Sequence, residues 1–245
     1  AKNDHLYLIK DVYEYKFENI TGTKKLKIPS NGLVSSWMWY LQRNDVNMRN
    51  EWNNYTNWPY KFLPSDTYLA PLNNNLDTTI PTGPGVNPDT SRATGLYITG
   101  DFNEVNRKHI LETAAILFNG EYRENTLTRG VYDYIEKYTR TNGFAKEGIY
   151  CYNFCLNTNP LDYQPSGAID MSKFKRIEME ITTYAPSVDL VNSRFDVICN
   201  EDGSPIGIRK SNWRLYDYNY NLVLFEERYN IISFVGGNCA LMYAR

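Results

Sequence analysis

Two glutamates, Glu178 and Glu180, are the residues whose type and spacing come nearest to a reactive pair, because a glycosidase uses paired carboxylates. They lie two residues apart in an alternating segment, so a strand would place them on one face, about 7 Å apart. The residues between and beside them are apolar, and the simpler interpretation is the solvent-facing side of a half-buried strand. A second charged group, residues 226–228 (Glu-Glu-Arg), is predicted to form a solvated turn after Phe225.

The histidines give no support to a catalytic site. There are only two: His5 lies in the leading segment, and His109 follows Arg107 and Lys108, where a solvated or capped role is expected. The sequence contains no Gly-x-Ser-x-Gly elbow, no glycine-rich phosphate loop and no His-Glu-x-x-His motif. We therefore expect no catalytic residue and no cofactor, and we predict that the chain is not an enzyme.

The cysteines do not show the spacing of a zinc site. Two of them are four residues apart, but no second pair and no histidine cluster accompanies them, so no metal is predicted. A chain of this size with few cysteines favours buried thiols in a reducing compartment over a disulfide framework. The four residues are Cys151, Cys155, Cys199 and Cys239.

Two Asn-x-Thr sequons are candidate glycosylation sites. They begin at Asn19 (Asn-Ile-Thr) and at Asn54 (Asn-Tyr-Thr). Either would carry a glycan only if the chain met the glycosylation machinery, and sequons this short arise often by chance.

Composition excludes several further classes of protein. The 245 residues carry a net charge of −2 with both signs interspersed, which leaves no basic footprint for nucleic acid. No apolar run of about 18 residues is present, so we expect no membrane span. The 21 tyrosines suit large half-buried sheet faces. The chain begins Ala-Lys-Asn-Asp without a methionine, and we expect a processed start or part of a longer chain.

Alternation of apolar and polar side chains predicts a chain made mostly of strands. Residues 12–18 place Tyr13, Tyr15 and Phe17 on one face, and residues 33–41 are apolar on both faces, as in a strand covered on both sides. Asn119-Gly120 and residues 200–203 are hairpin turns. One helix is predicted over residues 126–138. The other expected strands are residues 25–28, 109–118, 149–156, 177–182, 195–199, 215–225, 229–235 and 240–244.

Eight to ten strands without interleaved helices, repeats or a linker indicate one domain over residues 1–245. The predicted fold is an all-β, antiparallel, eight-stranded jelly-roll sandwich with long inter-strand loops and one or two short helices. The longest irregular stretch, residues 42–100, mixes asparagine with tryptophan and tyrosine. Such a stretch suits either a carbohydrate-binding platform or packing and subunit contact, and we expect the second.

One segment gives the sequence a specific family resemblance. Residues 157–172, with the core Gln-Pro-Ser-Gly-Ala-Ile-Asp-Met-Ser, resemble the signature of major capsid proteins of the nucleocytoplasmic large DNA viruses, although Asp170 stands where asparagine is commoner. Four further segments are similar to that family in the same order. They are a tryptophan-containing strand at 37–43, a strand ending in Phe-Asn-Gly within 110–123, a tyrosine-rich turn at 130–139 and the C-terminal segment 229–244.

The resemblance implies a subunit with two tandem jelly rolls, of which this chain would be the second. It implies homotrimers that form pseudo-hexagonal capsomers of an icosahedral capsid, with minor capsid and penton proteins as further partners and no direct contact with nucleic acid. It places the protein in the virion, assembled in the host-cell cytoplasm. We expect residues 43–60 to contact a neighbouring subunit or to build an outward tower. The alternatives are a carbohydrate-binding or receptor-attachment jelly roll and a β-sandwich glycosidase.

Overall fold

The computed structural model describes residues 4–57, 68–70, 97–99, 108–141, 145–159, 164–185, 195–199, 201–203, 205–210 and 218–243. The chain divides into two compact units. The first, which we call the sandwich unit, combines Ala1–Gln42, Ile110–Tyr184 and Asn219–Arg245. The second, the insertion unit, combines Arg43–His109 and Ala185–Tyr218, so both of its segments lie between segments of the sandwich unit along the sequence.

The larger sheet of the sandwich unit has six strands. They follow the order β1-β14-β3-β10, with β9 also paired to β3 and β15 paired to β14. Along β1 the side chains alternate as predicted, with Tyr13, Tyr15 and Phe17 half-buried and the residues between them exposed. The strands are β1 (His5–Ile20), β3 (Leu33–Arg43), β9 (Ile149–Asn153), β10 (Ile169–Asp170), β14 (Tyr220–Val235) and β15 (Asn238–Leu241).

The smaller sheet of the sandwich unit has five strands in the order β2-β11-β6-β7, with β8 also paired to β6. Its pairs are antiparallel. Asn119 (φ 54°) and Gly120 (φ 91°) form the predicted two-residue turn between β6 and β7, because this turn needs a left-handed backbone at both positions. The strands are β2 (Thr23–Lys27), β6 (Leu111–Phe118), β7 (Glu121–Tyr122), β8 (Leu127–Thr128) and β11 (Ile177–Thr183).

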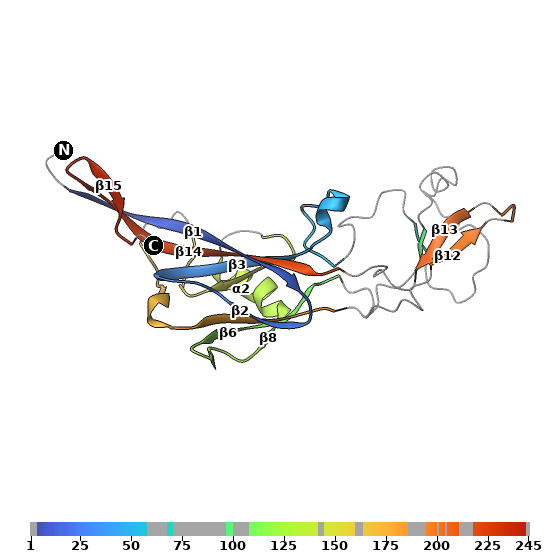
Figure 1. Ribbon diagram of the computed structural model, residues 1–245, viewed down its shortest axis with the longest axis horizontal. Helices are drawn as coiled ribbons and strands as arrows, with labels where there is room; N and C mark the ends of the chain where they lie inside the picture. The colour runs from blue at the N-terminus through green and yellow to red at the C-terminus, as the bar shows by residue number, and fades with distance from the viewer. Residues whose placement is uncertain are drawn as a thin grey trace. The chain divides into compact units, whose positions relative to one another are not determined.

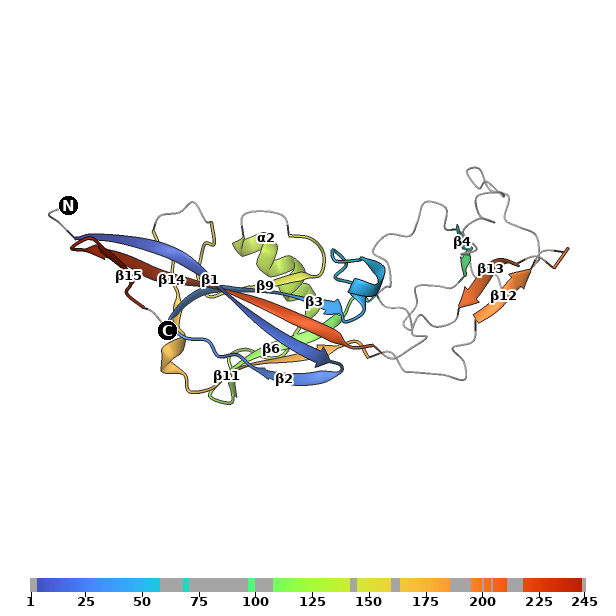
Figure 2. The ribbon, with the colours of Figure 1, turned by 45° about the horizontal axis from the view of Figure 1, so that its top comes forward.

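The strand order identifies the fold as a jelly roll. The chain passes repeatedly between the sheets: β1, β3, β9 and β14 lie in the larger one, and β2, β6, β8 and β11 in the smaller one. The resulting orders, β1-β14-β3-β9 and β2-β11-β6-β8, are those of eight strands wound into two Greek keys. Figures 1 and 2 show the two sheets as separate layers. The predicted fold class is therefore confirmed.

The core of the sandwich unit is aromatic. Trp37 and Trp39 of β3 are fully buried, and the Trp39 ring lies 5.3 Å from the Tyr132 ring and 5.9 Å from the Tyr150 ring, measured between centroids. Burial of each large apolar side chain contributes roughly 1.5–3 kcal/mol. The prediction that β3 is covered on both faces is wrong at Met38, which is 40% exposed because the outer face of the sheet is open to solvent there.

The helical segment begins later than predicted. It consists of η3, a π-helical turn (Val131–Ile135), followed directly by α2 (Glu136–Arg140). The predicted start at residue 126 is wrong because β8 occupies the first positions and pairs with β6. Tertiary pairing overrides the helical spacing of the apolar residues there.

The C-terminal strand is longer than predicted. β14 is one continuous strand, whereas the sequence predicts two strands separated by a solvated turn at residues 226–228. Glu226 and Arg228 are buried, and they lie on the face that also carries the buried Leu222 and Leu224. The predicted turn is wrong because these charged side chains are paired with each other inside the protein instead of being solvated.

The insertion unit has its own four-stranded sheet in the order β12-β13-β5-β4. β12 and β13 form the hairpin predicted at residues 200–203. The β12–β13 pair is antiparallel, but the pairs β13–β5 and β5–β4 are parallel, so the antiparallel prediction is wrong for these two pairs and the sheet is mixed. The elements are η1 (Val46–Arg49), β4 (Tyr68–Ala70), β5 (Tyr97–Thr99), β12 (Phe195–Cys199) and β13 (Pro205–Lys210).

Candidate functional site

The two glutamates that could form a reactive pair are each neutralised by a cation. On β11, Glu178 accepts a hydrogen bond from Arg176 Nη2 at 2.7 Å, and Glu180 lies 3.2 Å from Lys25 Nζ. Glu178 is only 6% exposed, so the prediction of a solvent-facing pair is wrong for it; the contact with Arg176 satisfies the buried charge. Paired in this way, these carboxylates stabilise the sheet.

The histidines of the described chain are not part of a reactive cluster. His5 is exposed and stacks on Tyr7 with 6.5 Å between the ring centroids, and His109 is half-buried. Within the described residues, no group of three or more His, Cys, Asp or Glu side chains could hold a metal ion. In the same part of the chain, no helix is long and apolar enough to span a membrane.

The described cysteines are free thiols with different environments. Cys151 and Cys155 are buried as predicted, whereas Cys239 on β15 is exposed, so the prediction is wrong for that residue. Burial raises the pKa of Cys151 to about 12, and its thiol therefore stays protonated and unreactive at neutral pH. The side chain of Cys199 lies outside the described residues.

The most polar part of the core is an ionic cluster around Glu226 of β14. Its carboxylate accepts hydrogen bonds from Trp37 Nε1 at 2.7 Å, Ser30 Oγ at 2.5 Å and Arg228 Nε at 2.5 Å. Arg228 Nη2 also donates to the Tyr15 hydroxyl at 2.5 Å. The cluster links β1, β3 and β14, and its buried charges satisfy each other, as burial requires.

A cavity of about 390 Å³ lies beside this cluster. The guanidinium carbon of Arg228 lies 4.0 Å from the centroid of the Tyr13 ring at its wall, and Asp170 accepts a hydrogen bond from the Ser172 backbone N at 3.1 Å. The charged groups of the cavity are therefore already engaged within the chain. Its lining residues include Leu33, Tyr229, Asn230, Met242 and Tyr243.

The signature segment, residues 164–172, forms a corner of the sandwich unit. Ser166 Oγ donates to the Asn157 backbone O at 2.7 Å and accepts from the Asn157 N at 2.8 Å. Met171 is fully buried, and its backbone N donates to the Gly32 O at 2.8 Å. These contacts tie the segment to the turn before β3, so its residues are structural.

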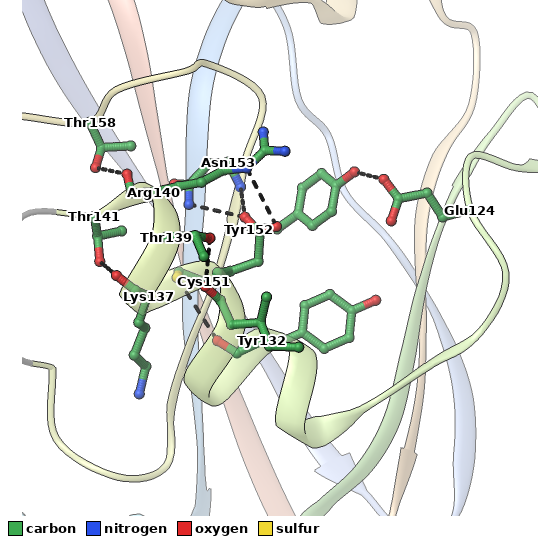
Figure 3. Close-up of polar contacts among 12 residues, drawn as sticks. Glu124, Tyr132, Lys137, Thr139, Arg140, Thr141, Cys151, Tyr152, Asn153 and Thr158 are labelled. Carbon is green, nitrogen blue, oxygen red and sulfur yellow. Dashed lines mark hydrogen bonds and ion pairs between the residues drawn. The ribbon is translucent and has the colours of Figure 1, made fainter.

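Hydrogen bonds fix the helical segment to its surroundings (Figure 3). Glu136 of α2 accepts from the backbone N and from Nδ2 of Asn153 on β9, at 3.3 and 3.1 Å. The Tyr132 hydroxyl donates at 2.8 Å to a backbone O of β6, and Thr158 Oγ1 donates to the Arg140 O at 2.9 Å. The segment is therefore braced on the side that faces the sheets.

Among the described residues of the sandwich unit, several apolar side chains are exposed to solvent, and two groups of them are named here. The first, which we call the tyrosine ridge, lies on the helical segment and consists of Tyr134, Ile135 and Tyr138. The second, the β1 strip, lies on the first half of β1 and consists of Leu6, Leu8 and Val12. Exposed apolar groups of this kind mark contact surfaces more often than catalytic sites.

The two sequons differ in accessibility. Asn19 is exposed, in a left-handed turn with φ of 57°. Asn54 is 1% exposed, and its Oδ1 accepts hydrogen bonds from Thr56 N at 3.0 Å and Thr56 Oγ1 at 2.6 Å. Glycosylation stays a prediction, and the folded chain offers Asn19 rather than Asn54 for it.

The predicted contact loop, residues 43–60, is described up to residue 57 and begins with a buried ion pair. Arg43 donates from Nε and Nη2 to Asp45 at 2.9 and 2.7 Å, and from Nη1 to the Asn57 O at 2.8 Å. Its guanidinium carbon lies 3.6 Å from the Tyr218 ring centroid, and the Tyr218 hydroxyl donates to Asn57 Oδ1 at 2.5 Å. This Arg43 clasp holds the two segments of the insertion unit together.

A carbohydrate platform would need several exposed aromatic rings in this loop. Of the tryptophans whose side chains are described, only Trp52 is exposed, and its Nε1 donates to Asn50 Oδ1 at 3.0 Å. One exposed ring does not form a platform. Trp58 and Tyr60 lie outside the described residues.

Neither the Glu226 cluster nor the Arg43 clasp is predicted from the sequence. The sequence does contain a signal for the Glu226 cluster. If the strand continues through the predicted turn, residues 222, 224, 226, 228 and 230 all lie on the same face. Opposite charges two residues apart on an otherwise apolar face predict a buried ion pair. The clasp joins positions more than 160 residues apart, between Asn57 and Tyr218, and carries no local signal.

Comparison with known proteins gives consistent matches. A family model described as "Large eukaryotic DNA virus major capsid protein" matches residues 1–239. A major capsid protein of Paramecium bursaria Chlorella virus 1 (PBCV-1) is 24% identical over 150 residues, which are 60% of this chain and 31% of that protein.

Solved structures show the same fold. PBCV-1 VP54, in a structure fitted into a reconstruction of the virophage Sputnik, has a TM-score of 0.63 and 19% identity, and the alignment covers 100% of this chain and 53% of that one. The Faustovirus major capsid protein has a TM-score of 0.53 and 13% identity over 92% of this chain and 33% of its own. The chain thus spans about half the length of VP54 and about a third of the length of the other two relatives. Because the family model covers nearly all 245 residues, the chain belongs to the major capsid protein family of large eukaryotic DNA viruses.

Proposed function

We propose that this chain is a structural subunit of an icosahedral viral capsid and is located in the virion. The observation that carries the proposal is the family match over residues 1–239. Two features of the described residues support it: the buried charges are paired inside the chain, and apolar side chains are presented outward on two surfaces. Such a distribution suits a protein that functions through contacts with other copies of itself.

In this proposal three copies form a pseudo-hexagonal capsomer. Minor capsid and penton proteins are further partners, nucleic acid is not contacted directly, and assembly takes place in the host-cell cytoplasm. The support is the family resemblance, together with a similar solved chain, of 20% identity and TM-score 0.59, that belongs to a quasi-atomic model of the PBCV-1 virus capsid.

We also propose that residues 1–245 form one jelly-roll domain that corresponds to the second of two in a longer subunit. The alignment with VP54 covers only 53% of that chain, which supports the presence of a second half in relatives. Each segment of the insertion unit starts and ends at the sandwich unit along the sequence, as expected for long loops of a single domain.

The mass and outline of the longer subunit that contains this chain test the proposal. We expect light scattering to give three times the mass of that subunit, and negative-stain electron microscopy to show hexagonal outlines that pack into arrays. A subunit that stays monomeric at every concentration and binds immobilised glycans would overturn the proposal in favour of a carbohydrate-binding jelly roll.

A further inference from the structure

Three strand ends of the sandwich unit form an arm. It consists of His5–Leu8 of β1, Ile231–Val235 of β14 and Asn238–Leu241 of β15, which are hydrogen-bonded side by side. The arm extends beyond the strands of the smaller sheet, and the N-terminal end of β1 lies at its tip (Figures 1 and 2). The larger sheet therefore continues where the smaller sheet no longer lies opposite it.

The inner face of the arm continues the core face of the sheet but is exposed. Inside the sandwich unit, Leu222 and Leu224 of β14 lie on this face and are 0% exposed. Phe234 lies further along the same face, because alternate residues of a strand share a face, and it is 40% exposed. Cys239 pairs with Phe234 on that face, and the Tyr7 ring, whose residue is 56% exposed, lies 5.8 Å from the Phe234 ring between centroids.

The outer face of the arm is apolar as well. It carries Leu6 and Leu8 of the β1 strip, which are 61% and 47% exposed, and Val235 of β14, which is 50% exposed. Edge strands are normally protected by charged side chains, yet none of the residues of the arm is Asp, Glu, Lys or Arg. The later part of β1 follows the rule, with exposed charged residues at positions 14, 16 and 18. This difference within one strand indicates that both faces of the arm are covered in the natural protein.

The edges of the arm favour protein over lipid as its cover. Among the described strands, β1 and β15 each pair with β14 alone, so the outer edge of each presents backbone groups without a strand partner. An open sheet edge is not tolerated in the hydrocarbon of a membrane, because nothing there accepts or donates hydrogen bonds. A protein partner can bury the apolar side chains and also satisfy the backbone groups of an edge.

The first half of the longer subunit is the protein partner that the position of the arm favours. In the proposed function residues 1–245 are the second half, so the first half joins the chain ahead of β1. His5, the first residue of β1, pairs with Phe234 near the tip of the arm, and the first half therefore enters beside the arm. A partner on the same chain acts at an effective concentration of about 1 mM. A second copy would instead leave the arm of every free subunit open to aggregation.

We propose that the first half of the subunit packs on both faces of the arm, and that the arm is the surface through which the two halves meet. Phe234 is the anchor on the inner face, and Leu6 is the anchor on the outer face. The inference rests on one part of the proposed function, which is the place of residues 1–245 as the second half of a longer subunit.

The thiol of Cys239 on the inner face reports whether the arm is covered. In the longer subunit, a thiol reagent should label Cys239 at least about 10-fold more slowly than the cysteine introduced by Met48→Cys, because a covered thiol reacts only when the contact opens. Met48 is a suitable reference, since it is 83% exposed and belongs to the insertion unit.

A variant of the anchor should remove this protection. Phe234→Lys places an ammonium group in the contact, and we expect it to raise the labelling rate of Cys239 at least about 10-fold. The matched control is Tyr138→Lys, which changes an aromatic residue of the same unit that is 91% exposed and lies outside the arm, and it should leave the rate unchanged. Circular dichroism melting must match the wild type, and Phe234→Ser replaces Phe234→Lys if the latter fails to fold.

Cross-linking identifies what covers the arm. The longer subunit is made with a photoreactive phenylalanine analogue in place of Tyr7, and isotope-labelled and unlabelled subunits are mixed in equal amounts. After illumination, mass spectrometry should find the Tyr7 position joined to peptides of the first half, with the same isotope in both peptides. Pairs of mixed isotope would show that a second copy covers the arm and would overturn the inference, as would cross-links confined to residues 1–245.

The outcomes separate this inference from the capsid role. A trimeric subunit in which Cys239 reacts as fast as the reference cysteine overturns the inference and leaves the capsid role standing. A subunit that stays monomeric and binds glycans, but protects Cys239 and forms the expected cross-links, keeps the contact and overturns the capsid role. A natural subunit with no jelly roll ahead of residue 1 overturns the inference outright.

Discussion

Removal of the Glu226 charge should strongly destabilise the sandwich unit. In Glu226→Gln, the buried Arg228 keeps its positive charge but loses the carboxylate that accepts from its Nε at 2.5 Å. Leaving one partner of a buried pair uncompensated costs about 3–5 kcal/mol. That is a large part of the ~5–15 kcal/mol that separates a folded domain from its unfolded chain. The glutamine amide can still accept a hydrogen bond from Trp37 or Ser30, so most of the loss in the free energy of unfolding comes from the missing negative charge.

Urea unfolding followed by tryptophan fluorescence measures this loss as a shift of the midpoint. The matched control is Glu14→Gln on the neighbouring strand, whose carboxylate is exposed and lies 3.2 Å from Lys16 Nζ; we expect a change of less than about 1 kcal/mol there. The double variant Glu226→Leu/Arg228→Met removes both charges and should recover most of the stability. A loss below about 1 kcal/mol in Glu226→Gln, or a double variant as unstable as the sum of its single variants, would refute the reasoning.

Three further predictions concern the clasp, the thiols and the sequons. Arg43→Lys should lower the free energy of unfolding by about 1–3 kcal/mol in the same urea assay, because lysine cannot form the two-point contact with its carboxylate partner or stack on a ring; an unchanged midpoint would contradict this. Burial raises the pKa of Cys151 from 9.0 to about 12, so its contribution to stability is complete below pH 9 and falls by up to about 1.4 kcal/mol per pH unit as the pH rises towards 12. Urea titrations of the wild type and of Cys151→Ser at pH 8 and pH 10 measure this loss of stability, and an equal pH dependence of the two proteins would contradict the prediction. In residues 1–245 alone, at pH 8, a thiol reagent should label the exposed Cys239 and leave the buried Cys151 unlabelled. In a secretory host, Asn19→Gln should remove any glycan seen as a gel shift and Asn54→Gln should not, because the second amide is buried; the reverse result would show that the glycan is added before folding.

Local patterns in the sequence predict those parts of the fold that depend on neighbouring residues. The alternation of Ile177, Met179 and Ile181 predicts β11, and these side chains are buried as that pattern requires. Asn119-Gly120 predicts its hairpin because few residue pairs accept a left-handed backbone at both positions. The many strands and one short helix predict the jelly roll, and the family model confirms the family that residues 157–172 indicate.

The errors arise where a distant partner decides the environment of a residue. Residues 226–228 look like a solvated turn in sequence, but partners from β1, β3 and the segment before β3 make them part of a buried strand. Leu127 has helical spacing with later residues, but it lies in β8, which pairs with the backbone of β6. Glu178 looks solvated in sequence, but β11 lies between β2 and β6, and the side chain is only 6% exposed. In each case the energy comes from a contact that the alternation of apolar and polar residues does not encode.

The distribution of charge is consistent with the proposed capsid role. Glu226 with Arg228, Arg43 with Asp45, and Asp133 with its two cations use their charges to hold elements in place. The last of these lies in the same short helical segment as the tyrosine ridge, so these ion pairs hold in place a segment that exposes apolar side chains. A subunit that repeats one contact many times in a shell gains more from a preformed surface than from an adaptable one, because each contact then loses less conformational entropy.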